Sequence, residues 1–543
     1  MNRTLLLAMA LTITSVVGSA AAAFDFGLGS PVERVANAIT EIDTQRATEL
    51  LQHSQLESAG LTLERARLAV YLGECDRAQA ILSNPLLNES REGASLAELA
   101  KSCARATAAG FVIEDKPRGV WLRLQDDADR ALAPFIFEVA AQARDTVSKE
   151  VGIDLPRPLR IDLVRDLFSL SAVSGLPLKA AETTGTLAVA RWGRVIMLSP
   201  RAPVQGYPWQ DTLAHEITHL LVTRATRDYA PLWMQEGLAK RFEVRWRAPR
   251  PFDKPDWADV AARNAALDGR SVGIDKLGPS IAMLPTPEAA GIAFAEVTSF
   301  MHFFIEQNGE AALRLLFADL RGNGQMGAEA ALLSATGYGL SEWNTRWQRF
   351  LRQPVKASVE APLHAAAPRA QGDAGRRVRL ADLLAGRGHG RESASEVEPL
   401  LNSLGRLPQI RARVASGLYT AGDDAAAERA LGTVAEIDGL YGPWFALAGR
   451  GFKRRGQPSE AESAFTLGLS ADPLSDEVAC EGYANHRNQA PKEAGPKDAG
   501  DTSAGPSVPN VTGSSDEDVK EPPLPTRPEW QELCKAARMV PRD

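Results

Sequence analysis

Hydrophobic positions recur at a helical spacing near both ends of the chain. Alanine and leucine dominate residues 39–106, where Gly73 separates two apolar stretches, so we expect helices joined by a turn at this glycine. Further along, small and apolar residues repeat at intervals of 34 positions. This period indicates stacked antiparallel helix pairs, because two helices and their turns take that length. The repeating positions are Gly388, Gly422 and Gly456, then Leu384, Leu418 and Phe452, and then Val397, Leu431 and Phe465.

The middle of the chain follows a different pattern. Residues 128–151 place apolar side chains on one helical face, which predicts a helix. Other runs are rich in β-branched residues or alternate apolar with charged side chains, and two of them flank Trp192 and Gly193, which predicts a hairpin. The expected strands are residues 116–124, 159–164, 186–190 and 194–198. From Asp211 onward the pattern is mainly helical, so we predict an α+β fold, a small sheet followed by helices.

The repeat period resembles that of tetratricopeptide repeats. The resemblance implies a repeat array near the C-terminus and an isolated relative of it near the N-terminus. Two segments rich in proline, alanine, glycine or acidic residues separate these parts, and the second is expected to be disordered because it cannot bury enough apolar surface. The expected parts are a helical region at residues 24–112, the mixed domain at 113–355, a linker at 356–373, the array at 374–485, a disordered linker at 486–528 and a tail at 529–543.

The first residues have the layout of a secretory signal peptide. Arg3 precedes an apolar run, and a block of small residues follows it. The run is short for a membrane span, so we expect cleavage near Ala23 and export of the mature chain to a periplasmic or extracellular location. An uncleaved anchor is the alternative. No later stretch reaches 18 uninterrupted apolar residues, so no integral membrane span is expected.

Charge and cysteine content narrow the function classes further. Lys and Arg number 61 against 68 Asp and Glu, a net charge of −7, which offers no basic field for nucleic acid. The four cysteines lack CxxC spacing, and in an exported chain they indicate two disulfides. Proximity in the sequence favours Cys75 with Cys103 and Cys480 with Cys534, although four cysteines allow three connectivities and free thiols are the alternative.

One motif points directly to metal chemistry. Residues 211–221 read DTLAHEITHLL, and on a helix His215 and His219 project from the same face, so both imidazoles can reach one ion. Glu216 lies beside the first of them. Seventeen residues after His219 comes Glu236, within PLWMQEGLAKRFE. Two antiparallel helices would return Glu236 to the two histidines, and His, His and Glu form a standard ligand set for a catalytic zinc ion.

HEITH followed by PLWMQEGLAKRFE resembles the gluzincin metallopeptidases, in particular their peptidase-MA-like branch. The resemblance covers roughly residues 116–352 and implies a zincin-like domain at residues 113–355. It assigns His215, His219 and Glu236 to one Zn²⁺ and makes Glu216 the general base. The absence of a GxMEN phrase favours an endopeptidase over an aminopeptidase. Both this family and helical repeats imply a peptide or protein substrate, and the repeats imply protein partners.

The chain departs from the family pattern at two places. Where a tyrosine or histidine commonly stabilises the oxyanion, the sequence has Phe294, and His302 or Tyr229 are the candidates to replace it.

An acidic residue four positions after the ligand glutamate orients a zinc histidine in thermolysin-like relatives, and here that position is Lys240. Asp211 and Glu243 are therefore the candidate partners of the zinc histidines.

The sequence thus predicts a secreted zinc metallopeptidase in which Glu216 activates a zinc-bound water. The alternative is a catalytically inactive, repeat-containing scaffold or peptide-binding protein of the cell envelope. Glu216 favours the enzyme, because a decayed active site would not require that carboxylate.

Overall fold

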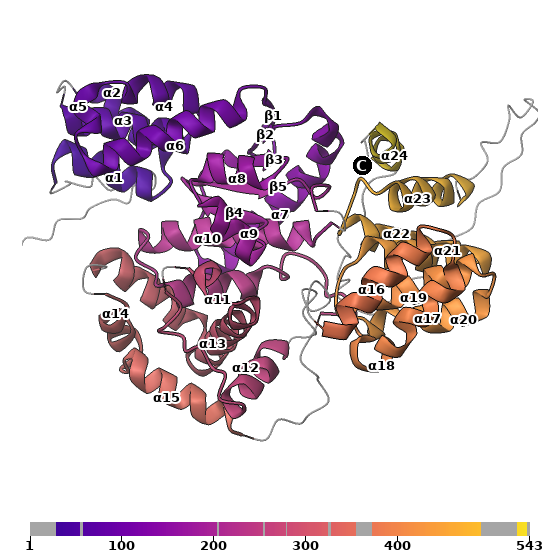
Figure 1. The fold of residues 1–543 in the computed structure, drawn as a ribbon. Helices are drawn as coiled ribbons and strands as arrows, with labels where there is room; N and C mark the ends of the chain where they lie inside the picture. The colour runs from indigo at the N-terminus through magenta and orange to yellow at the C-terminus, as the bar shows by residue number, and fades with distance from the viewer. Residues whose placement is uncertain are drawn as a thin grey trace, which may run out of the picture.

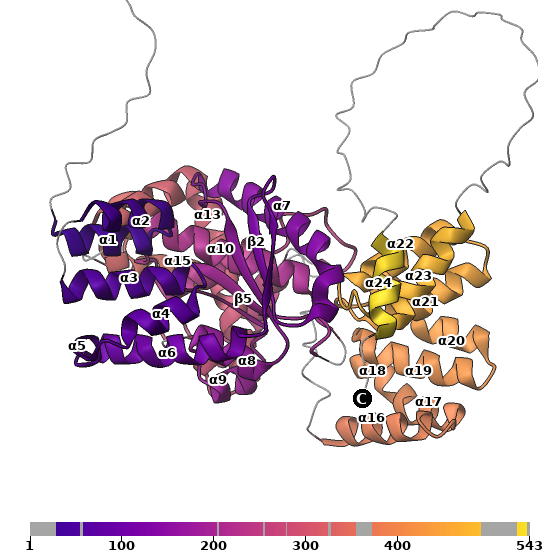
Figure 2. The ribbon, with the colours of Figure 1, turned by 90° about the horizontal axis from the view of Figure 1, so that it is seen from above.

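A computed structural model describes residues 29–54, 58–203, 206–253, 256–278, 280–323, 327–353, 372–489 and 529–539. Figure 1 shows two helical parts on opposite sides of a central part that contains the sheet, and the view in Figure 2 agrees. The signal peptide expected at residues 1–23 lies outside the described residues, as do residues 356–371 and 490–528 of the two expected linkers.

The N-terminal part consists of helices, as its apolar spacing predicts. Helices α3 and α4 form the expected pair, and Gly73 between them has a positive φ of 79°. A left-handed residue ends a helix without a steric penalty when it is glycine. The helices are α1 (Pro31–Thr40), α2 (Thr44–His53), α3 (Ala59–Tyr71), α4 (Cys75–Leu82), α5 (Pro85–Asn88) and α6 (Arg91–Thr107).

The sheet has five strands in the order β1-β2-β3-β5-β4. Its three inner strands are parallel, and each edge strand is antiparallel to its neighbour. Both faces of β5 are buried, with Val195 and Met197 in one apolar cluster and Ile196 and Leu198 in another. The strands are β1 (Phe111–Asp115), β2 (Val120–Leu124), β3 (Leu159–Val164), β4 (Ala188–Arg191) and β5 (Arg194–Leu198). The α+β prediction is confirmed at this level.

Two predicted strands start later than expected: the strand expected at residues 186–190 is Ala188–Arg191, and the larger difference is at β2. The sequence suggested a strand over residues 116–124, but the strand begins at Val120 and a turn joins it to β1. Asp115 accepts a hydrogen bond from the backbone N–H of Arg118 at 2.9 Å, and Gly119 has a positive φ of 63°. These residues favour a turn over an extended run.

Helices surround the sheet and extend beyond it. The helix predicted at residues 128–151 starts as a 3₁₀ turn and becomes α-helical at Ala133. The elements are η1 (Asp127–Leu132), α7 (Ala133–Val151), α8 (Leu167–Ser174), α9 (Leu178–Thr184), α10 (Trp209–Thr226), α11 (Leu232–Phe242), α12 (Trp257–Leu267), η2 (Ile281–Met283), α13 (Pro287–Asn323), α14 (Gly327–Thr336) and α15 (Leu340–Leu351).

The C-terminal part is a stack of helix pairs, which we call the array. Gly388, Gly422 and Gly456 end the first helix of successive pairs with φ of 81°, 79° and 71°, so the 34-residue period marks one recurring left-handed turn. Gly73 has the same conformation. The elements are α16 (Gly372–Ala385), α17 (Gly390–Val397), η4 (Glu398–Leu400), α18 (Leu401–Leu404), α19 (Pro408–Thr420), α20 (Asp424–Leu431), η5 (Val434–Glu436), α21 (Gly442–Arg454), α22 (Pro458–Leu469), α23 (Asp476–Gln489) and α24 (Glu529–Met539).

The array contacts the central part at the start of α10. The indole N–H of Trp209 donates to the carbonyl oxygen of Leu469 at 3.2 Å. The backbone N–H of Tyr207 donates to the carbonyl oxygen of Ala471 at 2.9 Å. Trp530 of α24 belongs to the same apolar cluster as the helices of the central part. Among the described residues, no helix has both the length and the apolar composition that a membrane span requires.

Candidate metal centre

Two antiparallel helices carry the predicted ligands. Helix α10 supplies both histidines, and α11 supplies the glutamate. Between the helices the chain reverses at Arg227 and Asp228, which have positive φ of 52° and 65°. Gly237 lets α11 approach α13 closely, because a Cβ atom there would lie 2.4 Å from the Cγ of Met301. The glycine that follows the ligand glutamate therefore sets the depth at which α11 packs.

The three predicted ligands converge. Nε2 of His215 lies 3.2 Å from Nε2 of His219, and Oε2 of Glu236 lies 3.6 Å and 3.7 Å from these two nitrogens. Tetrahedral zinc with bonds of about 2.0–2.1 Å would separate its ligand atoms by about 3.3 Å. These three residues are the one potential metal-binding group of His, Cys, Asp or Glu in the described part of the chain.

Each histidine has an acceptor for its other ring nitrogen. Nδ1 of His215 lies 3.0 Å from Oε2 of Glu243, and Nδ1 of His219 lies 3.1 Å from Oε1 of Gln235. These acceptors favour a proton on each Nδ1, which leaves the lone pair of each Nε2 directed at the other. Two lone pairs and a carboxylate at such distances repel one another unless a cation lies between them. The arrangement therefore fits a metal ion.

The electrostatics support the same conclusion. Burial disfavours a charged His215, but the carboxylates of Glu236 and Glu243 outweigh it and raise the pKa of His215 to about 9. Burial would raise the pKa of Glu236, yet the two imidazoles lower it below its ordinary value. Without a metal, the cluster thus attracts a proton to the place where a cation would bind.

Glu216 lies beside the cluster but is not part of it. Its side chain is buried, and the backbone N–H of Ala190 in β4 hydrogen-bonds to its carboxylate. Burial raises the pKa of Glu216 above its ordinary value, and the imidazoles of His219 and His215 oppose this without cancelling it. A carboxylate with a raised pKa is better matched to accept and return a proton near neutral pH.

Of the two candidate partners from the sequence, only Glu243 contacts one of the two converging histidines among the described residues. Asp211 accepts hydrogen bonds from Arg247 at 2.7 Å and from the indole of Trp246 at 3.2 Å. Arg250 also pairs with Asp211, and its guanidinium donates to the hydroxyl of Ser470 in the array at 3.1 Å. Asp211 therefore links the first turn of α10 to the array through Arg250.

The sequence interpretation missed Gln235. Its side-chain N–H donates to the hydroxyl of Thr223 at 3.3 Å, which fixes the amide that accepts from His219. A signal was present, because Gln235 and Glu236 are the only polar side chains between Leu232 and Ala239. A polar residue within such an apolar helix requires a partner.

The two candidates for oxyanion stabilisation lie on the turn between α10 and α11 and on α13. Tyr229 is in the turn between α10 and α11 and is 42% exposed. His302 lies on α13, and burial together with Arg241 and Arg245 lowers its pKa to about 4. In the described part of the chain, no hydrogen bond or ion pair joins either residue to the converging ligands or to Glu216.

Lys240 occupies the position where the resemblance noted in the sequence would place an acid. Its ammonium lies 3.1 Å from Oε2 of Glu243 and 5.3 Å from the ring centroid of Phe294. Burial would raise the pKa of Glu243, but Lys240 and then His215 lower it below its ordinary value. At Glu236, Lys240 adds a smaller contribution to that of the two imidazoles. Glu243, the residue directly after α11, thus provides the carboxylate that the position of Lys240 lacks.

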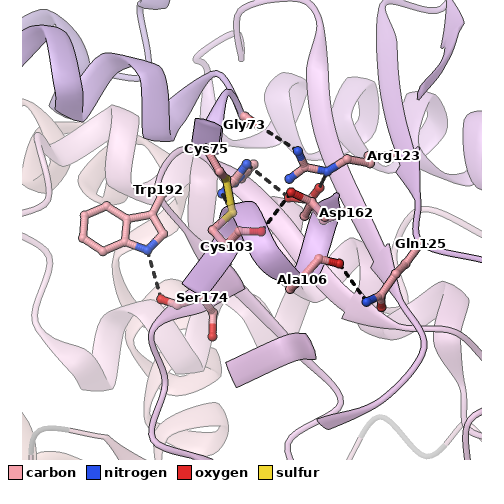
Figure 3. The surroundings of a disulfide bond; sticks show 11 residues. Gly73, Cys75, Cys103, Ala106, Arg123, Gln125, Asp162, Ser174 and Trp192 are labelled. Atoms are coloured by element: carbon pink, nitrogen blue, oxygen red, sulfur yellow. Dashed lines mark hydrogen bonds and ion pairs between the residues drawn. A yellow bond between two sulfur atoms is a disulfide. The ribbon is translucent and has the colours of Figure 1, made fainter. Parts of the chain in front are cut away.

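The disulfides have the pairing that sequence proximity favoured. Cys75 joins Cys103, and Cys480 joins Cys534. Figure 3 shows the first disulfide beside a buried ion pair, in which Nε of Arg123 lies 2.6 Å from Oδ1 of Asp162. Arg123 also donates to the carbonyl oxygen of Gly73 at 2.7 Å. The N-terminal helices are thus held to the sheet next to their own disulfide.

Replacing Glu243 by alanine is expected to weaken zinc binding by about 10- to 100-fold, because His215 would lose the acceptor that fixes its ring and tautomer. Competition against a chromogenic zinc chelator measures the affinity. Glu306→Ala is the matched control, since Glu306 is exposed on α13. Equal zinc affinities for the two variants would show that Glu243 does not support the metal site.

Comparison with known proteins identified no matching family model, no similar curated protein and no similar solved structure.

Proposed function

We propose that this protein is a zinc-dependent metallopeptidase that hydrolyses peptide bonds within proteins. The convergence of two imidazole nitrogens and one carboxylate, with a separate buried carboxylate beside them, carries the proposal. Three protein ligands leave one coordination position for water, which is the arrangement of catalytic zinc sites and not of structural ones. The resemblance of the two motifs to gluzincins supports the same reaction class.

The chain's own residues divide the chemistry between them. Bound zinc would lower the pKa of a water molecule to about 7. Glu216 would accept a proton from the attacking water and return it to the leaving amine, a role that requires a carboxylate next to the metal-binding residues but not among them. His215, His219 and Glu236 would hold the metal, while Glu243 and Gln235 orient the imidazoles.

The edge of the sheet offers a place for substrate. Strand β4 is the last strand in the order of the sheet, and the hydrogen bond from Ala190 ties it to Glu216. An extended peptide that pairs with an edge strand gains main-chain hydrogen bonds irrespective of its sequence. Substrate paired with β4 would pass next to the proposed base. The other strand of this hairpin, β5, lies inside the sheet, so the proposed substrate edge is limited to Ala188–Arg191.

Two further proposals concern the role of the array and the location of the protein. The repeated left-handed glycine turns and the 34-residue period support a tetratricopeptide-like array, and such arrays present surfaces for protein partners. Two disulfides, with no free cysteine among the described residues, support an exported location, because disulfides persist mainly in oxidising compartments.

Metal analysis and an unbiased peptide digestion test the function together. We expect about one zinc per chain and cleavage of peptides within a library, both abolished by a chelator and restored by added zinc. Cleavage that persists after complete removal of zinc would contradict the proposal. Identification of the cleaved bonds by mass spectrometry would also distinguish an endopeptidase from an aminopeptidase.

A further inference from the structure

The array contains a cavity of about 390 Å³. Helix α20 and the turn η5 form one wall, and α21 and α22 form the others. The lining is mainly aromatic and aliphatic, with a few charged residues among it. Its apolar members include Leu431, Val434, Trp444, Phe445, Phe452 and Leu467. A cavity of this size and composition lies within the range that binds ligands.

An early end to one repeat helix creates the space. Helix α22 has 12 residues, whereas α20, one period earlier, has eight. Gly432 ends α20 with a positive φ of 69°, and its counterpart Thr466 is still helical. The last helical turn is therefore missing from α20, and side chains of α21 and α22 are left facing the gap.

The cavity is continuous with a surface that already contacts an aromatic side chain from outside the array. Phe445 lines the cavity and also contacts Phe252 of the central part, with ring centroids 6.4 Å apart. Within the array, Trp530 of α24 packs on Gly482 of α23 in a similar way, since a Cβ atom there would lie 2.1 Å from the indole. Aromatic side chains thus pack on the helices of the array both from within it and, at Phe252, from outside it.

We propose that this cavity receives an aromatic side chain of a protein substrate, at a position remote from the bond that is cleaved. The inference rests on the proposed peptidase function and adds a recognition site to it. The undescribed segments that adjoin the array, residues 354–371 and 490–528, contain no Phe, Tyr or Trp. Phe24 and Phe26 precede the N-terminal helices, which lie on the far side of the central part from the array. Both observations favour a separate polypeptide as the occupant. The cavity borders the contact between the array and the central part, so a chain bound there lies beside the peptidase domain.

Ser463 provides a way to close the cavity. It lines the cavity but is exposed on α22, so Ser463→Trp would fill the opening without replacing a core residue. Ser395 occupies the equivalent position two periods earlier and is also exposed. Both hydroxyls donate to the carbonyl oxygen four residues before them, at 3.1 Å and 2.9 Å. Ser395→Trp is therefore a matched control for the added indole.

The probe is a short biotinylated peptide of glycine and serine with one central p-benzoylphenylalanine, irradiated with the full-length, zinc-loaded protein. We expect crosslinks to Val434, Phe452 or Leu467. The same peptide with a central phenylalanine should compete, and one with a central glutamate should not. Ser463→Trp should reduce crosslinking about tenfold or more, the scale expected for losing the burial of one aromatic side chain. Ser395→Trp should leave it unchanged.

The outcomes separate this inference from the peptidase function, because crosslinking requires no turnover. Crosslinking that is unaffected by Ser463→Trp, or competition by the glutamate peptide, would overturn the inference. Hydrolysis of library peptides without crosslinks in the cavity would also overturn it while leaving the peptidase function intact. Crosslinks in the cavity without any hydrolysis would support the recognition site and contradict the proposed peptidase function.

Discussion

Replacing Glu216 by glutamine is expected to lower the rate of peptide hydrolysis by about 10²- to 10⁴-fold while zinc stays bound. The amide keeps the size of the side chain and its hydrogen bond from Ala190, but it cannot accept a proton at neutral pH. The ligand atoms of His215, His219 and Glu236 are untouched. Turnover of a peptide identified from the library, measured together with zinc content, tests both parts of the expectation.

Glu236→Gln is the matched comparison, since the same chemical change falls on the other glutamate of the site. A neutral amide replaces an anionic ligand, so zinc affinity itself should fall. Near-full turnover in Glu216→Gln would contradict the mechanism even if zinc is confirmed. If neither the variants nor the wild-type protein cleaved any peptide while zinc remained bound, the alternative of an inactive scaffold would be favoured.

Replacing His219 by alanine is expected to remove most of the zinc from the purified protein. Two remaining ligands hold the ion poorly, and Gln235 would lose the imidazole that it orients. Inductively coupled plasma mass spectrometry of protein dialysed against metal-free buffer measures the zinc that remains.

His302→Ala is the control for this substitution, because it removes another histidine of the same part of the chain. His302 lies near Arg241 and Arg245 and not among the converging ligands. The zinc content of the His302→Ala protein should therefore match that of the wild type. Equal zinc content in His219→Ala and wild type would refute the assignment of the metal site.

The sequence by itself determined the features that depend on local spacing. A four-residue separation places His215 and His219 on one helical face because of the helical period. Gly73, Gly388, Gly422 and Gly456 mark helix ends because a left-handed turn strongly favours glycine. These features require only short-range geometry, and the structure has the helices and turns where the pattern predicted them. The start of β2 was misplaced because Asp115 and Gly119 form a turn ahead of the apolar run that begins at Val120.

The tertiary structure decided which distant side chains meet. Asp211 and Glu243 were equal candidates in the sequence, yet only the docking angle of α11 against α10 brings Glu243 to His215, while Arg247 and Arg250 hold Asp211. That angle depends on the reversal at residues 227–228 and on the close approach at Gly237, neither of which spacing reveals.

The contacts of the array were likewise hidden from the sequence. The contact of Trp209 with Leu469 joins residues 260 positions apart, and the cavity exists because α20 ends one turn before its counterpart α22. Periodicity predicts which face of an element is apolar, but not which partner covers it. That choice is made when whole elements pack together, since packing depends on the combined shape of surfaces from distant parts of the chain.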